Sequence, residues 1–446
     1  MGRKKKSAAL DVMMNGEIVG KLLRQSSGML EFIYDDSWLS SEKSRSISLS
    51  MPSVAKRHSG TVVENFFDNL LPDNLEIKKR IQARFAIPGN SSFDLLSEIG
   101  RDCIGALQLV PEGHKIDDIR NITAEPLTET QIASILKSYK TAPLGMDQAH
   151  DFRISLAGAQ EKTALLKLNN QWCRPLGTTP TTHIIKLPIG IIKSAGLDLD
   201  LSDSVENEWL CHLLLQEFKI PVAACEIRNF GGVKALVVER FDRQLSQDGS
   251  WIIRLPQEDM CQALAVSPGI KYENQGGPGI SDIMKLLQGS IDPGKDRYLF
   301  MKVVFLYWLL GAIDGHGKNF SLFLRPGNNY ELSPVYDVIS VYPLVATGQL
   351  DKRNIAMAMA VKGKAKHYHW ENIQLRHWRN TANAEGFSDT LMREIVKGVL
   401  LSAETAVSNV MKKIPADFPP NIYQPTLKMF SEKCQAVLKY QWKSFI

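Results

Sequence analysis

A long apolar run, Val303–Ile313, ends directly at a polar loop, Asp314–Asn319. Such a run is typical of a buried segment, and it is too short to span a bilayer. Pro334–Asp337 follows the loop and brings a second acid, Asp337, into another apolar stretch, Leu332–Ile339. The sequence therefore predicts that two acids and one amide lie together at the edge of a buried core.

The order and spacing of Asp314, Asn319 and Asp337 match the layout that protein kinases use to move a γ-phosphoryl group. In that layout the first Asp accepts the proton of the acceptor hydroxyl, while the Asn and the second Asp hold Mg²⁺. We therefore interpret Asp314 as a catalytic base and Asn319 and Asp337 as metal ligands. His316 and Lys318 of the same loop either contact phosphate or brace the loop. The alternative is a polar turn, which Asp and Asn also favour.

A lysine on a predicted strand precedes this loop in the chain. In the strand 183–187, alternation places Lys186 on the same face as the apolar Ile184. A lysine among apolar neighbours needs an anionic partner, because burying an unpaired charge is costly. Nucleotide phosphates together with a helix glutamate, Glu206 or Glu208, would supply that partner. The alternative is an edge-strand lysine that reaches solvent.

A short turn upstream, residues 155–163, has small residues that let backbone N–H groups approach phosphate. It contains Gly-x-x-x-Lys-Thr, but it lacks the second glycine of a Walker A loop and the three glycines of the usual kinase loop. The alternative is a tight turn into a hairpin. The turn residues that we predict to bind nucleotide are Ala157, Gly158, Ala159, Gln160, Glu161 and Lys162.

The segment Glu239–Asp242 ends a predicted strand and leads into a polar loop. A segment of this kind can form the hinge between two lobes, where backbone groups meet adenine. Gln257 lies shortly after it. The alternative is a salt-bridged strand end.

Periodicity divides the chain into strand-rich and helix-rich parts. Hairpins are predicted at 10–24, with Asn15–Gly16 as the turn, and at 163–173 and 224–239. Helices are predicted at 63–71, 93–100, 128–140 and 203–218, and helical periodicity dominates from about 257 onward. The predicted fold is α+β, with a bilobal kinase-like core. Its segments are an N-terminal α+β module (1–110), a connection (111–150), a sheet-rich lobe with the phosphate loop (151–256) and a helical lobe with the catalytic and metal-binding loops (257–446).

The bulk composition is ordinary for a globular protein of 446 residues, with 44% hydrophobic and 23% charged residues. A net charge of +5 does not by itself indicate nucleic-acid binding, although a basic stretch at 352–379 could touch a phosphate backbone. The six cysteines form no Cys-x-x-Cys pair, so we expect them to be reduced and mostly buried. No apolar signal-peptide core follows the basic Met1–Lys6, so a cytoplasmic location is the expectation.

A set of motifs spans nearly the whole chain: Phe66–Asp73, Phe93–Asp102, Asp151–Ser155, Ala157–Thr163, Thr181–Pro188, Val238–Arg243, Leu255–Cys261 and Asp314–Asn319. Together these motifs resemble the HipA family, the serine/threonine kinase toxins of bacterial type II toxin–antitoxin modules. The resemblance implies a protein-kinase-like or phosphatidylinositol-kinase-like fold that uses ATP and Mg²⁺.

The resemblance also implies roles for individual residues. Lys186 would contact an ATP phosphate, and Glu239, Phe241 and Gln257 match positions near the nucleotide. Ser155 matches a site of inhibitory autophosphorylation. A phosphate there adds nearly two negative charges to the loop that must cradle ATP, so it should switch the enzyme off.

The partners implied by the resemblance are a small helix-turn-helix antitoxin resembling HipB, operator DNA reached through that complex, and a protein substrate, with no membrane involved. In the best-known members the substrate is glutamyl-tRNA synthetase, an aminoacyl-tRNA synthetase whose phosphorylation arrests translation and promotes persistence. Two alternative functions are also consistent with some of these sequence features. One is a small-molecule kinase of related fold, and the other is a DNA-bound regulatory subunit with an inactive kinase site.

Overall fold

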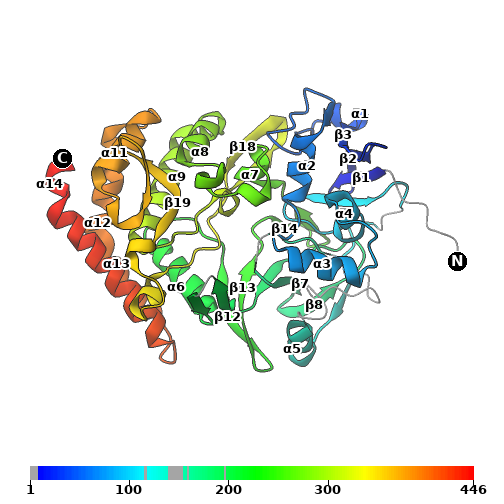
Figure 1. Cartoon of the computed structure of the whole chain (residues 1–446). Helices are drawn as coiled ribbons and strands as arrows, with labels where there is room; N and C mark the ends of the chain where they lie inside the picture. The colour runs from blue at the N-terminus through cyan, green and yellow to red at the C-terminus, as the bar shows by residue number, and fades with distance from the viewer. Residues whose placement is uncertain (1–8, 115–117, 139–153, 158–159, 195–196, 446) are drawn as a thin grey trace. The chain divides into compact units, whose positions relative to one another are not determined.

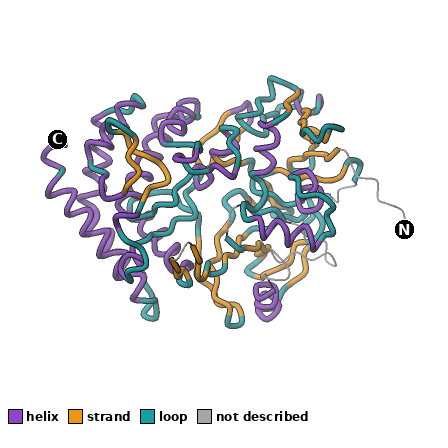
Figure 2. The backbone as a smooth tube through the Cα atoms, viewed as in Figure 1, coloured by secondary structure: helices purple, strands orange, loops and turns teal. Residues whose placement is uncertain are grey.

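The computed structural model describes residues 9–114, 118–138, 154–157, 160–194 and 197–445. The chain divides into two compact units, which are described one at a time. The first unit comprises Met1–Leu187, Arg228–Gly269 and Ser321–Tyr330, and the second comprises Pro188–Ile227, Ile270–Phe320 and Glu331–Ile446. Figure 1 follows the chain by colour, and Figure 2 shows that the longest helices belong to the second unit.

A five-stranded antiparallel sheet in the order β4-β3-β2-β1-β5 opens the first unit. Asn15 and Gly16 have φ values of 47° and 81°, which confirms the predicted tight turn between the first two strands. The core beside this sheet includes Phe67 and also takes in Ile154 and Leu156 from far along the chain. The elements are β1 (Ala9–Met14), β2 (Glu17–Arg24), β3 (Leu30–Tyr34), α1 (Asp36–Leu39), β4 (Arg57–Ser59), α2 (Thr61–Asp68), α3 (Leu75–Arg84), α4 (Ser92–Ile99) and β5 (Leu107–Pro111).

A second sheet has six strands in the order β12-β13-β9-β7-β8-β6, and β9 with β13, β7 with β9, β7 with β8 and β6 with β8 pair antiparallel. Both hairpins predicted in this region are confirmed. The elements are β6 (Ala124–Pro126), α5 (Glu129–Lys137), β7 (Lys162–Leu168), β8 (Gln171–Pro175), β9 (His183–Lys186), β12 (Cys225–Phe230) and β13 (Val233–Glu239).

Short strands complete the first unit. β14 pairs with β15, and β16 pairs with β17 although some 60 residues separate them in the sequence. The elements are β14 (Arg243–Leu245), β15 (Ile252–Arg254), β16 (Gln257–Asp259), α7 (Met260–Ala263), β17 (Ser321–Arg325) and β18 (Asn329–Leu332), the last of which crosses into the second unit.

The second unit is built around α9 (Pro293–Leu310). The helix begins after Asp292, whose side chain caps it, and ends at Gly311, whose φ of 65° suits glycine. From Phe300 to Leu310 the helix is almost entirely buried, because other helices of this unit pack against it. The remaining elements are β10 (Gly190–Ser194), β11 (Leu197–Leu201), α6 (Ser204–Glu217), α8 (Ile280–Leu286), α10 (Tyr342–Ala346), β19 (Ala356–Lys362), β20 (Lys366–His369), α11 (Leu375–Ala384), α12 (Asp389–Lys413), α13 (Pro420–Tyr440) and α14 (Trp442–Phe445).

The expectation that helices dominate after residue 257 is confirmed, although this part of the chain also contributes β16 to β20. One local expectation was wrong. The apolar stretch Leu332–Ile339 is not one element: β18 ends at Leu332, and Asp337 lies in a loop. No helix in the described part of the chain is both long enough and apolar enough to cross a membrane.

Candidate active site

The polar loop after α9 is held by its own backbone and by a neighbouring strand. Asn319 donates its side-chain Nδ2 to the backbone oxygen of Asp314 at 2.7 Å, and its N–H bonds to the His316 oxygen at 2.9 Å. Ala358, in β19, donates its N–H to the Ile313 oxygen at 2.9 Å. These bonds fix the turn that presents Asp314.

Asp314 differs from the rest of its loop in exposure. Its side chain faces solvent, whereas His316, Lys318 and Asn319 are buried. Burial lowers the pKa of His316, and the carboxylates of Asp314 and Asp337 oppose that shift. The structure therefore brings the two predicted acids near one imidazole. The Nδ1 atom of that imidazole is buried and has no hydrogen-bond partner within the described part of the chain.

Asp337 has a φ of 61°, a left-handed conformation that is uncommon outside glycine and often marks functional sites. The preceding Tyr336 donates its hydroxyl to the backbone oxygen of Lys318 at 2.9 Å. This bond connects the segment to the loop Asp314–Asn319, which we call the catalytic loop for its predicted role. Further on, Ser340 bonds to Asn207 of α6 through its N–H at 2.9 Å. The local strain is thus held by contacts on both sides of Asp337.

The donor set at this loop fits Mg²⁺. The cation prefers hard oxygen ligands, such as the carboxylate of Asp337 and the amide of Asn319. Because the amide nitrogen of Asn319 donates to Asp314, the amide oxygen is the atom that remains to ligate a cation. The buried Nδ1 of His316 is a further polar atom suited to a bound polar group.

In the first unit, Lys162 of β7 and Lys186 of β9 are direct cross-strand partners. Lys186 is buried and Lys162 is half-buried. The structure thus places the two predicted phosphate-binding lysines side by side. Their contact with phosphate stays a prediction.

The turn before β7 is only partly described. Gln160 donates its side-chain Nε2 to the Leu187 oxygen at 2.6 Å, and Glu161 forms an ion pair with Arg80 of α3. Both side chains therefore brace the turn, while Ala157 is half-buried. The predicted Gly158 and Ala159 lie outside the described residues, as do Met1–Lys6 and residues 151–153.

Ser155 is fully buried in the first unit. Its hydroxyl donates to the backbone oxygen of Leu70 at 2.7 Å, and its N–H donates to the backbone oxygen of Asp102 at 3.1 Å. The flanking Ile154 and Leu156 belong to the N-terminal core. A phosphate on Ser155 cannot be accommodated in this packing, so its addition requires the segment to leave the core.

Two of the residues predicted to lie near the nucleotide, Phe241 and Gln257, are neighbours of the same side chain, Phe323. The ring of Phe241 packs edge-on against Phe323 of β17, with centroids 5.6 Å apart, and Gln257 is the register partner of Phe323. Glu239 is exposed at the end of β13. The structure therefore brings Phe241 and Gln257 together around Phe323, which sequence reasoning missed.

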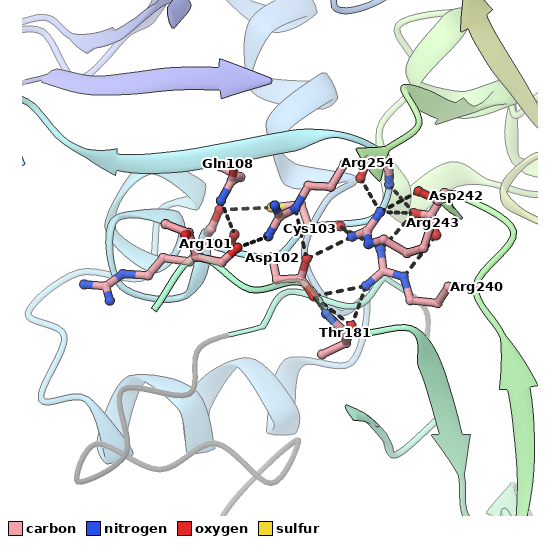
Figure 3. A network of polar contacts seen from close by, with 12 residues as sticks. Arg101, Asp102, Cys103, Gln108, Thr181, Arg240, Asp242, Arg243 and Arg254 are labelled. Carbon is pink, nitrogen blue, oxygen red and sulfur yellow. Dashed lines mark hydrogen bonds and ion pairs between the residues drawn. The ribbon is translucent and has the colours of Figure 1, made fainter. Parts of the chain in front are cut away.

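Between Glu239 and Gln257 the chain enters a buried ionic cluster centred on Asp102, which we call the Asp102 cluster (Figure 3). Arg243, Arg240 and Arg254 place guanidinium nitrogens 2.9, 3.3 and 3.4 Å from the Asp102 carboxylate. Two further members complete it: Thr181, which donates its hydroxyl to Asp102 at 2.7 Å, and Asp242, which lies 2.8 Å from Arg240. The salt-bridged strand end is thus the arrangement observed for Arg240 and Asp242.

The charged neighbours of Asp102 determine the direction in which its pKa shifts. Burial alone would raise the pKa of the carboxyl, but the guanidiniums of Arg243, Arg240 and Arg254 outweigh burial and hold the pKa well below its usual range. Because Asp102 also accepts the Ser155 N–H, one residue anchors the Ser155 segment and the strand ends at 240–254.

Two features of the second unit bear on the remaining sequence predictions. Glu206 and Glu208 are both buried on α6, and Glu208 lies 3.9 Å from His212 Nε2. In the basic stretch 352–379, Lys366 pairs with Glu273 and Arg379 with Asp389. Part of that positive charge is therefore neutralised within the unit.

Sequence reasoning also missed Tyr272, whose hydroxyl donates to Asp314 Oδ1 at 2.6 Å. Tyr272 belongs to none of the motifs identified in the sequence. The tertiary fold alone places it beside the loop Asp314–Asn319. No group of three or more potential metal ligands among His, Cys, Asp and Glu occurs within the described ranges.

Family models match most of the chain. The model described as HipA N-terminal domain matches residues 10–110, and the one described as HipA-like C-terminal domain matches residues 154–407. The Asp102 cluster joins these two parts, since Asp102 lies in the first and its three arginines lie in the second.

Relatives and solved structures agree with these models. The chain is 33% identical over 407 residues to the Sinorhizobium fredii protein named "Putative kinase Y4mE", covering 90% of this chain and 92% of that one. It is 30% identical over 291 residues to the serine/threonine-protein kinase toxin HipA of Shewanella oneidensis, covering 63% of each. The structure of the Shewanella oneidensis toxin–antitoxin complex of HipA, HipB and operator DNA matches with a TM-score of 0.81 at 22% identity, over 98% of this chain and 99% of that one.

Proposed function

Because the chain belongs to the HipA family, we propose that it is an ATP- and Mg²⁺-dependent serine/threonine protein kinase that serves as the toxin of a toxin–antitoxin module. The observation that carries the proposal is the loop after α9. It combines an exposed acid, Asp314, with a buried amide and a second acid near the same imidazole. This is the arrangement that phosphoryl transfer requires.

In the proposed reaction, Asp314 accepts the proton of a serine or threonine hydroxyl as the hydroxyl oxygen attacks the γ-phosphorus of ATP. The bond from that phosphorus to the β–γ bridging oxygen breaks, and ADP leaves. Asn319 and Asp337 would hold Mg²⁺, which when bound neutralises charge on the phosphates. His316 and Lys318 line the same loop and would face the phosphates.

The first unit would supply nucleotide contacts. Lys162 and Lys186, opposite each other on β7 and β9, would bind phosphate oxygens. Phe241 and Gln257, gathered around Phe323, would lie near the base. The other proposed nucleotide-binding residues are Ala157, Gly158, Ala159, Gln160, Glu161 and Glu239.

We further propose that autophosphorylation at Ser155 inactivates the enzyme. Its hydroxyl is buried against the Leu70 carbonyl, so the segment must leave the core before it can accept phosphate. Returning a doubly charged phosphate to that site would be costly, because the partner of the Ser155 hydroxyl is a backbone carbonyl oxygen, which cannot donate to an anion. The Ser155 segment would then remain displaced.

The proposed partners follow from family membership. A HipB-like antitoxin would bind the chain, and the complex would bind operator DNA and repress transcription in the bacterial cytoplasm. The proposed substrate is an aminoacyl-tRNA synthetase, with the glutamyl enzyme as the first candidate, and its modification would arrest translation. The domains proposed for these tasks are 1–110, 151–256 and 257–446, with 111–150 as a connection.

The test is transfer of labelled γ-phosphate from ATP by the natural chain and by Asp314→Asn. Loss of a general base is expected to slow transfer by a factor of about 10² to 10⁴. Nucleotide binding, measured as the rise in melting temperature on adding ATP and Mg²⁺, should persist in the variant. Asp351→Asn is a matched control, since Asp351 is an exposed acid of the second unit that forms an ion pair with Arg353.

The identity of the molecule that accepts the phosphoryl group distinguishes the protein-kinase proposal from the two alternative functions. Transfer to Ser155 and to a synthetase, but not to aminoglycosides or lipids, supports the protein-kinase proposal. Transfer to a small molecule alone would favour a small-molecule kinase. Operator binding by a chain that shows no phosphoryl transfer would indicate a regulatory subunit with an inactive site.

A further inference from the structure

Tyr272 reaches the predicted catalytic base from a segment 42 residues earlier in the chain. Its hydroxyl donates to Asp314 Oδ1 at 2.6 Å, and its ring packs edge-on against His316 with centroids 5.0 Å apart. One side chain therefore touches both the acid and the imidazole of the loop. All of these residues belong to the second unit.

The backbone around Tyr272 is fixed at several points. Gly317 of the catalytic loop donates its N–H to the Lys271 oxygen at 3.3 Å. On the other side, Glu273 accepts the Ala360 N–H at 2.6 Å and pairs with Lys366 at 2.8 Å, so it is anchored to β19 and β20. The phenol is thus delivered to Asp314 by a held segment, as preorganised sites require.

The hydrogen bond constrains the carboxylate without neutralising it. A phenol hydroxyl donates one hydrogen bond and carries no positive charge, in contrast to lysine or arginine. When Oδ1 of Asp314 is occupied by Tyr272, Oδ2 is the oxygen available to an acceptor hydroxyl. The bond from Asn319 to the Asp314 backbone oxygen holds the same residue from the other end.

We propose that Tyr272 is a positioning residue for phosphoryl transfer, acting through Asp314. The inference rests on the proposed kinase function. In the step itself, the acceptor proton passes to Asp314 while the new O–P bond forms and ADP leaves, and Tyr272 keeps its own proton throughout. Its task is to hold the carboxylate at the angle and distance at which the acceptor proton can be taken.

The experiment compares Tyr272→Phe with the natural chain, using ATP, Mg²⁺ and a protein acceptor. Phenylalanine retains the ring that packs on His316 and removes only the donor. We expect kcat to fall by about 10- to 100-fold, as a misplaced catalytic group does. The KM values for ATP and for the acceptor should stay within about twofold, because Tyr272 acts on the base and not on binding.

Two controls separate positioning from a structural role. Tyr298→Phe removes a tyrosine hydroxyl that bonds to Glu394 at 3.3 Å elsewhere in the second unit, and it should leave kcat unchanged. In the Asp314→Asn background, Tyr272→Phe should cause no further loss, since a residue that acts through Asp314 has nothing left to position. Additive losses in this double-mutant cycle would overturn the proposal.

The direction in which kcat changes in Tyr272→Phe also tests the proposal. An unchanged kcat in Tyr272→Phe overturns the inference, and an increased kcat overturns it in favour of a tyrosine that blocks the acceptor's place. Both results leave the kinase proposal standing. Absence of any transfer by the natural chain would instead reject the kinase proposal and this inference together.

Discussion

Asp102 and Asp314 show two opposite uses of an aspartate in one chain. Asp102 is buried in the first unit among three guanidiniums and a threonine hydroxyl. Asp314 is exposed in the second unit, and its side chain accepts a hydrogen bond from a neutral phenol, that of Tyr272. The first carboxylate is locked in its ionised form, whereas the second is accessible to an incoming hydroxyl.

This difference shows that burial and neighbouring charges determine which role a carboxylate can have. A buried charge is tolerated only when cations and hydrogen bonds compensate it, and such a network fixes structure rather than reacting. An exposed carboxylate held by a neutral donor is accessible from solvent. The comparison therefore favours an anchoring role for the Asp102 cluster, and it agrees with the catalytic role proposed for Asp314.

The largest expected effect on stability is that of Asp102→Ala. Removing the acid leaves three buried arginines with less compensation, so the free energy of unfolding should fall by about 3 to 5 kcal/mol. Asp314→Ala should change it by less than about 0.5 kcal/mol, because the site is exposed. Urea unfolding of both variants measures the contrast, and similar losses in the two would contradict the comparison.

An intermediate effect is expected at the glycine that ends α9. Gly311 has a φ of 65°, and a Cβ at this position would lie 2.7 Å from a ring atom of the buried Tyr342. Gly311→Ala should therefore destabilise the chain by about 1 to 3 kcal/mol and disturb the loop that presents Asp314. The matched control is Gly348→Ala, where φ is 74° but no atom lies within 4 Å.

The difference between these two alanine variants isolates the clash from the backbone strain that they share. Thermal unfolding and phosphoryl transfer should both suffer more in Gly311→Ala. Equal losses would mean that the contact with Tyr342 does not hold the catalytic loop in place.

A pH-dependent effect is expected at Glu258, a buried acid of the first unit that accepts hydrogen bonds from neutral groups. Ser48 donates its hydroxyl at 2.5 Å and Leu49 its N–H at 2.9 Å, and Asp259 follows in sequence. Burial raises the pKa of Glu258 from 4.5 to about 8. The contrast with Asp102, whose pKa is lowered, comes from the arginines.

A raised carboxyl pKa means that the folded state binds the proton more tightly than the unfolded state. The resulting stabilisation is complete below pH 4.5 and is lost as the pH rises to about 8, at up to about 1.4 kcal/mol per pH unit. Glu258→Gln should remove this slope, which urea unfolding from pH 5 to pH 8 would measure. An unaltered slope in the variant would show that Glu258 does not carry the pH dependence.

The sequence predicted most local elements well where a local signal was strong. Asn15–Gly16 marked a turn because both positions need positive φ, and the α+β class with its hairpins followed from alternation. The strand β19 (Ala356–Lys362) was missed because alanine and methionine favour helices. Its pairing with β20 and its bond to Ile313 override that preference.

For the candidate site, spacing alone singled out Asp314, Asn319 and Asp337, since a short loop must place base and ligand close together. Asp337 was expected on an apolar element, yet it lies in a loop with a φ of 61°. Its backbone conformation depends on Tyr336 and Ser340, whose partners are distant in sequence. No local pattern reports such contacts.

The sequence by itself predicted the class of chemistry, because Asp314 and Asn319 are near neighbours along the chain. Only the tertiary structure decided that Asp102 anchors the Ser155 segment and that Tyr272 meets Asp314. The residues of those contacts are separated by up to 152 positions for Asp102 and by 42 for Tyr272. Periodicity reveals which side chains are buried, but the packing of whole elements selects their partners.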